Sequence, residues 1–343
     1  MSQSGLTRRQ LHQWIGAGIA AISAPAIIRS GFAQSVPKIT VRMGYTWASS
    51  QYYSIYLLGR DKGFYKEAGV DPTFIEGTGS GTGVQLLAAG KADLGAAIAS
   101  GAVINAVSQG GKIRMVAATL ASNPIAVISK ASSPLQIPKD LVGKTIGMPP
   151  GTEQEQLWPA FLQVNKLDPN SIKVVSIAGD ALPAALGMSR IDGYVSYSTD
   201  LPFIEKSGLN VVTMLFPDFG IVYAPGEGVV ASQGMLEHKP EIVRAFLSGL
   251  RRTFTYALAH PDEAAAAGAK AFPDQIQEKV ALSTIKIMED VNKNAVRGGN
   301  VLNLFRMTDA QWQGTIDLLT KFGGLKNAAP VSQYYTNDFL PKA

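Results

Sequence analysis

The chain has 343 residues, 46% of them hydrophobic, with 31 lysines and arginines against 26 aspartates and glutamates. It contains no cysteine, which excludes disulfides, thiolate metal sites, cysteine nucleophiles and a lipid-modified cysteine anchor. Histidine is nearly as scarce, and His238 and His260 each lie beside a proline at a predicted helix boundary. This composition argues against an enzyme, and we expect no catalytic residue, metal site or cofactor.

The first 33 residues have the pattern of an export signal. Arg8 and Arg9 precede an apolar run over residues 15–28, and a small-x-small pattern ends at Ala33. The paired arginines favour the twin-arginine route. The apolar run is shorter than the roughly 20 residues that a membrane-spanning helix needs. We therefore predict a signal peptide over residues 1–33, cleaved near Ala33, and a protein that works in the periplasm.

Removal of the signal would leave 28 basic and 26 acidic side chains, a net charge of +2 over 310 residues. So small a surplus gives no reason to expect a nucleic-acid or membrane-surface partner. A chain of this length is long enough for two domains of about 150 residues each. We expect a monomer that diffuses freely.

Strands and helices alternate from residue 38 to residue 215, which indicates open, mostly parallel α/β sheets. The alternation is interrupted at Asn123-Pro124, where a second unit begins. We predict strands at 38–44, 70–76, 93–99, 125–129, 145–148, 173–177, 193–196 and 210–215, with another ending near residue 119, and helices at 52–61, 84–89, 153–165 and 182–188.

The C-terminal third changes to helical spacing after a short strand at 229–231. We predict helices at 239–259, 261–271, 274–290 and 308–322, and expect them to pack on the first sheet. The chain would then cross between two lobes twice, near 123–127 and 224–230. The predicted domains are residues 34–123 with 229–343 for lobe 1, and residues 124–228 for lobe 2.

Four segments in this order resemble those of a known family. Residues 86–95 contain L-x-x-G-x-x-D-x-G, Asn123-Pro124 matches a lobe-crossing strand, residues 138–147 are similar to x-x-D-L-x-G-K-x-I-G, and residues 182–193 resemble a second L-x-x-G-x-x-D-A copy with Gly193 in place of alanine. Together they are similar to the periplasmic substrate-binding proteins of bacterial ABC importers. The nearest subgroup takes up nitrate, sulfonates, taurine and pyrimidine precursors of thiamine.

The resemblance implies a two-lobed, type II periplasmic-binding-protein fold with two hinge crossings. Such a protein captures a small-molecule solute by hinge closure and delivers it to an ABC permease in the inner membrane. Fungal synthases that make the thiamine pyrimidine have a similar scaffold, but they depend on a cysteine cluster and a histidine. The shared segments are scaffold, so they leave the solute open.

Candidate ligand-binding residues follow the predicted strands, because ligands of open α/β sheets collect at the carboxyl ends of strands. Trp47 lies in a loop between glycine and serines, where we expect no core packing, so it and Tyr52 could stack on a flat ring. The glycine-rich loop 77–83 is either an anion or polar-group site at a helix N-terminus or a flexible turn that needs positive φ. The candidates from the first lobe are Trp47, Ser49, Tyr52, Ser80, Thr82 and Ser100.

The candidates from the crossing and the second lobe are Asn123, Thr152, Glu153 and Tyr197. Thr152 is most simply a helix N-cap, and Glu153 either favours the helix dipole or suits a cationic ligand. No arginine lies in these loops, which favours a neutral or weakly charged, ring-bearing solute such as a pyrimidine or another aromatic compound. The alternative solute is nitrate, a sulfonate or taurine. A synthase-like enzyme is a further alternative that the sequence favours less.

Overall fold

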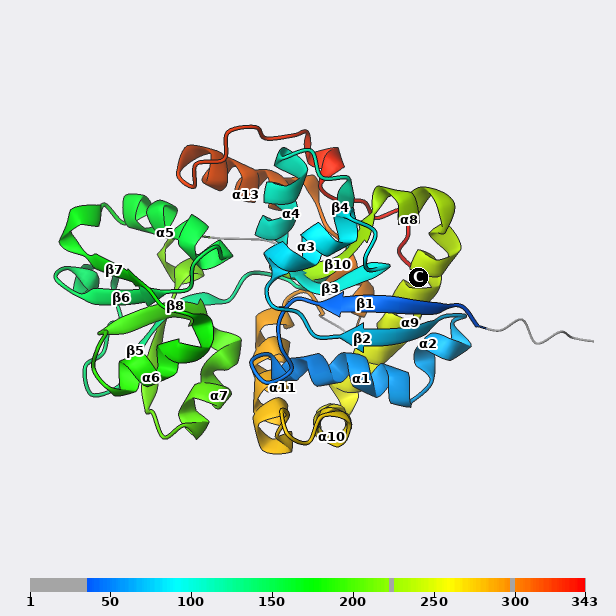
Figure 1. Cartoon of the computed structure of the whole chain (residues 1–343), viewed down its shortest axis with the longest axis horizontal. Helices are drawn as coiled ribbons and strands as arrows, with labels where there is room; N and C mark the ends of the chain where they lie inside the picture. The colour runs from blue at the N-terminus through cyan, green and yellow to red at the C-terminus, as the bar shows by residue number, and fades with distance from the viewer. Residues whose placement is uncertain (1–35, 222–224, 297–299, 343) are drawn as a thin grey trace, which may run out of the picture. The chain divides into compact units, whose positions relative to one another are not determined.

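A computed structural model describes residues 36–221, 225–296 and 300–342. The export signal predicted for residues 1–33 lies outside the described residues. Within them the strands form two five-stranded sheets flanked by helices, which confirms the predicted α/β architecture (Figure 1). No helix in these three ranges combines the length and the apolar character that crossing a membrane requires.

The first sheet has the strand order β2-β1-β3-β10-β4. β1 is parallel to β2 and β3, whereas β10 is antiparallel to both of its neighbours, β3 and β4. Every residue of β3 is buried, as its apolar sequence LGAAIA predicts. The strands are β1 (Lys38–Met43), β2 (Asp71–Ile75), β3 (Leu94–Ala99), β4 (Ile113–Leu120) and β10 (Glu227–Ser232).

The second sheet has the order β7-β6-β8-β5-β9, with β6 parallel to β7 and β8 and with β5 antiparallel to β8 and β9. Both sheets are therefore mixed. The antiparallel strand is β10 in the first sheet and β5 in the second. The chain arrives at each of these strands from the other lobe, so each begins at the edge where the parallel strands end. The strands are β5 (Ile125–Lys130), β6 (Thr145–Met148), β7 (Lys173–Ser176), β8 (Gly193–Tyr197) and β9 (Val211–Leu215).

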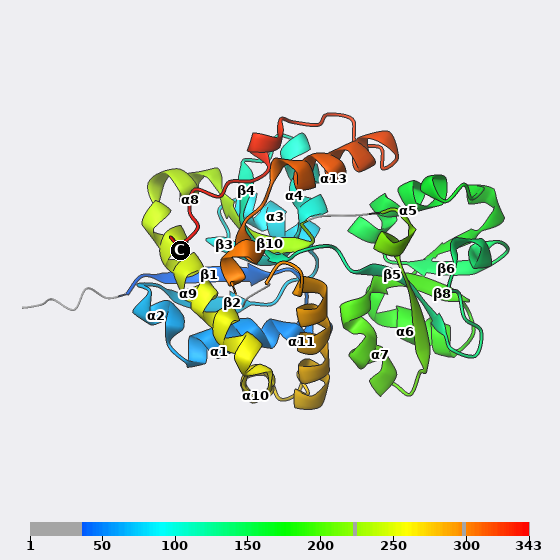
Figure 2. The ribbon, with the colours of Figure 1, turned by 180° about the vertical axis from the view of Figure 1, so that it is seen from behind.

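Helices from both ends of the described chain cover the first sheet. α9 contacts α1 and α2, and Figure 2 shows it in yellow beside them. One apolar core joins β1 and α1 to α9, α10, α11 and α12. The helices are α1 (Ser54–Asp61), α2 (Phe64–Glu67), α3 (Ser80–Ala88), α4 (Ser100–Ser108), α8 (Gln233–His238), α9 (Pro240–Ala259), α10 (Pro261–Ala271), α11 (Glu278–Asn292), α12 (Val301–Phe305) and α13 (Asp309–Lys321).

Three helices flank the second sheet, and α13 reaches one of them, α5, from the C-terminal part of the chain. A second core contains both Trp158 of α5 and Trp312 of α13, so it extends across both lobes. A smaller third core lies between the second sheet and its other two helices. The helices are α5 (Glu153–Val164), α6 (Leu182–Gly187) and α7 (Leu201–Lys206).

Each sheet contains the same aspartate contact at the amino end of its parallel strands. The Asp93 carboxylate, just before β3, accepts hydrogen bonds from the Thr40 N–H (2.8 Å) and hydroxyl (3.0 Å). The Asp192 carboxylate, just before β8, accepts one from the Thr145 N–H (2.8 Å). We call these pairs the strand clasps, and they give the two L-x-x-G-x-x-D segments a structural role.

The two crossings between the lobes lie side by side. The Gly226 N–H donates to the Leu120 carbonyl (2.9 Å), and a Cβ on Gly226 would lie only 2.5 Å from the Ser122 carbonyl oxygen. A glycine is therefore required where the returning chain passes the outgoing one. The Gly226 carbonyl accepts from the N–H of Ser100, so the second crossing is also tied to the start of α4.

Candidate functional site

A cavity of about 410 Å³ opens at the carboxyl ends of the parallel strands and is lined by both lobes. The first lobe contributes Tyr45, residues 78–82 and α4. The second lobe contributes residues 150–153 and Gln156 from the loop after β6 and the start of α5. Four of the predicted candidates, Ser80, Thr82, Thr152 and Glu153, line this interlobe cavity.

Glu153 lines the cavity and connects the two lobes. It is the first residue of α5, and its buried carboxylate accepts hydrogen bonds from Gly101 N–H (3.3 Å) and Tyr197 hydroxyl (3.2 Å). The amide of Asn123, at the first crossing, donates to the same carboxylate. Gly101 lies in the first turn of α4, where backbone N–H groups lack helical acceptors and the helix dipole favours a negative charge. The structure thus brings the predicted Asn123, Glu153 and Tyr197 together.

A second buried carboxylate, Glu227, was missed in the sequence. It begins β10, is 4% exposed, and accepts a hydrogen bond from the Tyr52 hydroxyl at 2.5 Å. Burial raises its pKa to about 8, and the negative charges of Glu153 and Asp200 contribute, against the hydrogen bond from Tyr52. The sequence predicts ligand contacts at residues that follow strands, whereas Glu227 begins an antiparallel strand at the same edge. The sequence feature that could have identified Glu227 is its position between two glycines, Gly226 and Gly228.

Asp200 lies at the carboxyl end of β8 and forms the third acidic group. Its carboxylate accepts a hydrogen bond from the Ser196 hydroxyl (2.7 Å). Burial raises its pKa to about 6, although hydrogen bonds from Ser196 and from the Tyr197 backbone oppose this shift. The three carboxylates therefore belong to one buried region of like charge.

Tyrosine rings surround these carboxylates. Tyr45 from the first lobe and Tyr197 from the second meet edge to face, with ring centroids 6.2 Å apart. Burial raises the pKa of Tyr45, Tyr52 and Tyr197, so their hydroxyls remain neutral hydrogen-bond donors. We call this group the tyrosine–carboxylate cluster, and it consists of Tyr45, Tyr52, Tyr197, Asn123, Glu153, Asp200 and Glu227.

The expectation that Trp47 is free of core packing is wrong. Its side chain is 2% exposed, stacks on Phe272 with ring centroids 4.7 Å apart and meets Tyr53 edge to face. The C-terminal helices bring Phe272 over the loop after β1, and no local pattern around Trp47 signals this. Ser49 also makes local contacts, because its hydroxyl lies 2.9 Å from that of Thr46.

The glycine-rich segment 77–83 is only partly a loop. α3 begins at Ser80, four residues before the predicted helix, and Gly79 precedes it with a φ of 136°. This positive φ agrees with the turn that we weighed for the segment. The Ser80 hydroxyl accepts a hydrogen bond from Ala99 N–H (3.0 Å), so it joins α3 to the end of β3.

Two further candidates use their hydroxyls to hold the backbone. Ser100 donates to the carbonyl of Pro225 (2.5 Å), which ties α4 to the second crossing. Thr152 occupies the N-cap position of α5, as predicted, but its hydroxyl donates to the Pro149 carbonyl (2.8 Å) rather than accepting from the helix. Thr152 is thus the N-cap residue of α5 without a side-chain capping hydrogen bond, and the ligand contacts of these candidates stay predictions.

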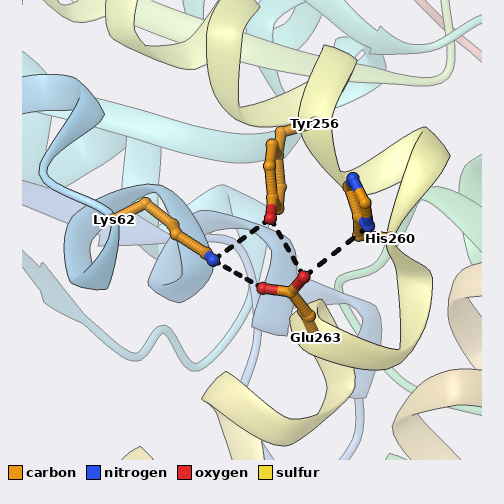
Figure 3. Close-up of polar contacts among 4 residues, drawn as sticks. All are labelled: Lys62, Tyr256, His260 and Glu263. Carbon is orange, nitrogen blue, oxygen red and sulfur yellow. Dashed lines mark hydrogen bonds and ion pairs between the residues drawn. The ribbon is translucent and has the colours of Figure 1, made fainter.

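A separate polar group joins helices α1, α9 and α10 (Figure 3). The Glu263 carboxylate forms an ion pair with Lys62 (2.5 Å) and accepts a hydrogen bond from the Tyr256 hydroxyl (2.9 Å). These hydrogen bonds lower the pKa of Glu263. The ring of His260 stacks on Tyr256, with centroids 4.2 Å apart. These contacts hold three helices together, so His260 has a structural role.

Residues 50–264 match a family model described as NMT1/THI5 like. The chain belongs to the NMT1/THI5-like family. This finding confirms the resemblance predicted from its sequence segments. The described parts of this family member contain no group of three or more histidine, aspartate or glutamate side chains that could hold a metal ion.

Two curated relatives are similar to this NMT1/THI5-like chain over much of its length. The riboflavin-binding protein RibY of Chloroflexus aurantiacus is 25% identical over 316 residues, covering 90% of this chain and 87% of that protein. The formylaminopyrimidine-binding protein of Halalkalibacterium halodurans is 22% identical over 227 residues, covering 66% of this chain and 68% of that protein.

Solved structures share the fold at low identity. The aliphatic sulphonate-binding protein SsuA of Escherichia coli has a TM-score of 0.67 at 13% identity, covering 88% of this chain and 99% of that chain. The nitrate-binding protein NrtA of Synechocystis PCC 6803 has a TM-score of 0.59 at 10% identity, covering 89% and 87%. At such identities the likeness concerns the fold alone.

Proposed function

We propose that this chain is the solute-binding component of an ABC importer and that it holds a small, ring-bearing solute between its two lobes. The observation that carries the proposal is the interlobe cavity, in which side chains of both lobes meet at the carboxyl ends of the strands. Closure of such lobes around a solute buries it and changes the surface that a permease can recognise.

The ring-bearing class is supported by Tyr45, which lines the cavity, and by two relatives. Tyr45 meets Tyr197 of the opposite lobe edge to face, so a flat ring packed against this pair would contact both lobes at once. The two curated relatives are named for riboflavin and formylaminopyrimidine, both of which are ring compounds. The carboxylate of Glu153 lines the cavity and opposes an anionic solute, which argues against nitrate, a sulfonate or taurine.

The same proposal includes export, with the predicted signal over residues 1–33 cleaved and the protein working in the periplasm as a monomer. Its partners are the solute and an ABC permease. We propose a binding protein rather than an enzyme, because the cluster offers hydrogen bonds and aromatic faces, and the absence of cysteine excludes a cysteine nucleophile.

A thermal-shift screen followed by calorimetry tests this function. Ligands raise the melting temperature by mass action, so we expect flavins, pyrimidines or other aromatic compounds to raise it, and nitrate and taurine to leave it unchanged. Tyr45→Ala and Tyr197→Ala should each weaken binding of the compound found at least tenfold. Phe203→Ala, which removes a partly exposed ring from α7, is the matched control. Unchanged affinity in both tyrosine variants, or a shift with nitrate or taurine alone, would refute the proposal.

A further inference from the structure

The start of α4 is capped from the other lobe. The residue before the helix is Ala99, whose methyl group cannot accept a hydrogen bond, so the cap residue itself supplies none. The N–H of Gly101, in the first turn, instead donates to the carboxylate of Glu153 (3.3 Å). Since Glu153 is the first residue of α5, a side chain of the second lobe supplies the acceptor that this helix of the first lobe lacks.

Both crossings between the lobes are tied to this junction. The second crossing is fixed to α4, because the Ser100 hydroxyl donates to the Pro225 carbonyl (2.5 Å). The first crossing is fixed to α5, because the amide of Asn123 donates to the Glu153 carboxylate. The contact between Gly101 and Glu153 therefore joins the two elements to which the crossings are tied, and such crossings are where a rotation between lobes is absorbed.

The second lobe also orients the side chain of Glu153. This side chain is buried, and its carboxylate accepts a hydrogen bond from the hydroxyl of Tyr197, at the end of β8 (3.2 Å). The ring of Tyr197 in turn meets that of Tyr45 from the first lobe. We call Gly101, Asn123, Glu153 and Tyr197 the interlobe latch. Buried polar groups that lose a partner are costly, so these contacts favour the arrangement in which the lobes meet.

The bond between Gly101 and Glu153 is the one that a rotation of the lobes would break. At 3.3 Å it is longer than most N–H···O hydrogen bonds, whose usual range ends at about 3.2 Å. Asn123 and Tyr197 belong to the first crossing and to the second lobe, whereas Gly101 belongs to the first lobe. A small rotation about the crossings is therefore enough to separate Gly101 from Glu153 while the other two contacts stay in place.

We propose that Glu153 is a positioning residue that holds the lobes closed through the Gly101 N–H and so sets the balance between the closed and open forms. This inference rests on the lobe closure of the proposed function and adds the contact that controls it. The apparent affinity for a solute scales with the fraction of protein in the competent form. Weakening the latch should thus weaken binding even of a solute that does not touch Glu153.

The distance between two spin labels, measured in the purified protein without solute, tests the latch. The chain has no cysteine, so Ala88→Cys on α3 and Gln163→Cys on α5 can be labelled specifically. Both positions are exposed, and both helices contribute to the wall of the interlobe cavity, so opening the cavity lengthens this distance. By pulsed electron paramagnetic resonance we expect mainly a short distance in the otherwise unchanged protein. Glu153→Ala should lose most of this short-distance population.

Three further variants sharpen the test. Glu153→Gln keeps one acceptor oxygen, so it should retain part of the short-distance population. Asn123→Asp keeps the shape of the side chain but places a second carboxylate beside Glu153, so it should favour the open form. The matched control is Glu155→Ala, in the same turn of α5. The Glu155 carboxylate accepts from the Gly151 N–H (2.6 Å) within the second lobe, so its loss should leave the label distance unchanged.

Three outcomes would overturn the inference. The first is an unchanged distance distribution in Glu153→Ala, or in Asn123→Asp where the alanine variant does not fold. The second is an equal lengthening in the Glu155→Ala control, and the third is a long distance alone in the protein that keeps the latch. Because no solute is present, these outcomes are separate from failure of the proposed function. Ring compounds that fail to bind would refute that function while leaving a responding latch in place.

Discussion

Carboxylates occur at both ends of the parallel strands, and the two ends use them differently. At the amino ends, Asp93 and Asp192 form the strand clasps, in which a backbone N–H of the neighbouring strand satisfies each carboxylate. At the carboxyl ends, the like charges of Glu153 and Asp200 both act on Glu227. The fold satisfies the first set with its own backbone. The second set is not satisfied in this way, and this contrast suggests three experiments.

The largest effect should come from pH. Because the pKa of Glu227 rises from 4.5 to about 8 on folding, the folded state holds a proton that the unfolded state loses between these values. Stability is therefore highest in mild acid and falls as the pH rises, by about 1.4 kcal/mol per pH unit at most and about 3 kcal/mol from pH 5 to pH 8. Urea titrations at several pH values measure this slope.

Glu227→Gln is the control for that slope, since glutamine does not titrate. Its stability should depend much less on pH, with Asp200 contributing a smaller change nearer to pH 6. A wild-type protein whose stability stays constant or rises from pH 5 to pH 8 would show that the two ends of the sheets do not differ as inferred.

The next effect concerns the clasp of the first sheet. Asp93→Ala removes the acceptor of two hydrogen bonds from Thr40, one of them from a strand N–H. We expect a loss of about 1–3 kcal/mol in the free energy of unfolding. Chemical denaturation measures it, and affinity for the solute should not change. Loss of affinity at full stability would instead place Asp93 among the functional carboxylates.

The smallest effect is expected in the second sheet. Asp192→Ala removes one hydrogen bond, from the Thr145 N–H, in an exposed setting where water can replace it. We therefore expect the free energy of unfolding to fall by about 0.5–1 kcal/mol, which is less than for Asp93→Ala. The same denaturation series measures both variants, and a larger loss for Asp192→Ala would reverse the ranking.

The fold could be predicted well from local patterns. Alternating apolar residues and helical spacing indicated two α/β units. The direction of β10 was harder, because a strand that returns from the other lobe has no local mark of its orientation. Glu227 was missed for the same reason, because it lies at the carboxyl ends of the parallel strands only through the antiparallel direction of β10.

The candidate site was predictable only in part. Glu153, Asn123 and Tyr197 follow or flank predicted strand ends, and they meet. Trp47 has an equally suitable position in the sequence but is buried by Phe272, 225 residues later. Whether a loop faces the cavity or is covered by the C-terminal helices depends on residues far away in the sequence, so the local sequence does not reveal it.

The place of β10 in the first sheet also affects how the chain folds. All strands of the second sheet lie between residues 125 and 215, so that sheet can form from one continuous segment. The first sheet has β10 between β3 and β4, and β10 begins only at Glu227. Until that segment is available, β3 and β4 each have an unpaired edge, and edges of this kind promote aggregation. Non-local pairing is slow, so the first lobe should complete its folding after the second.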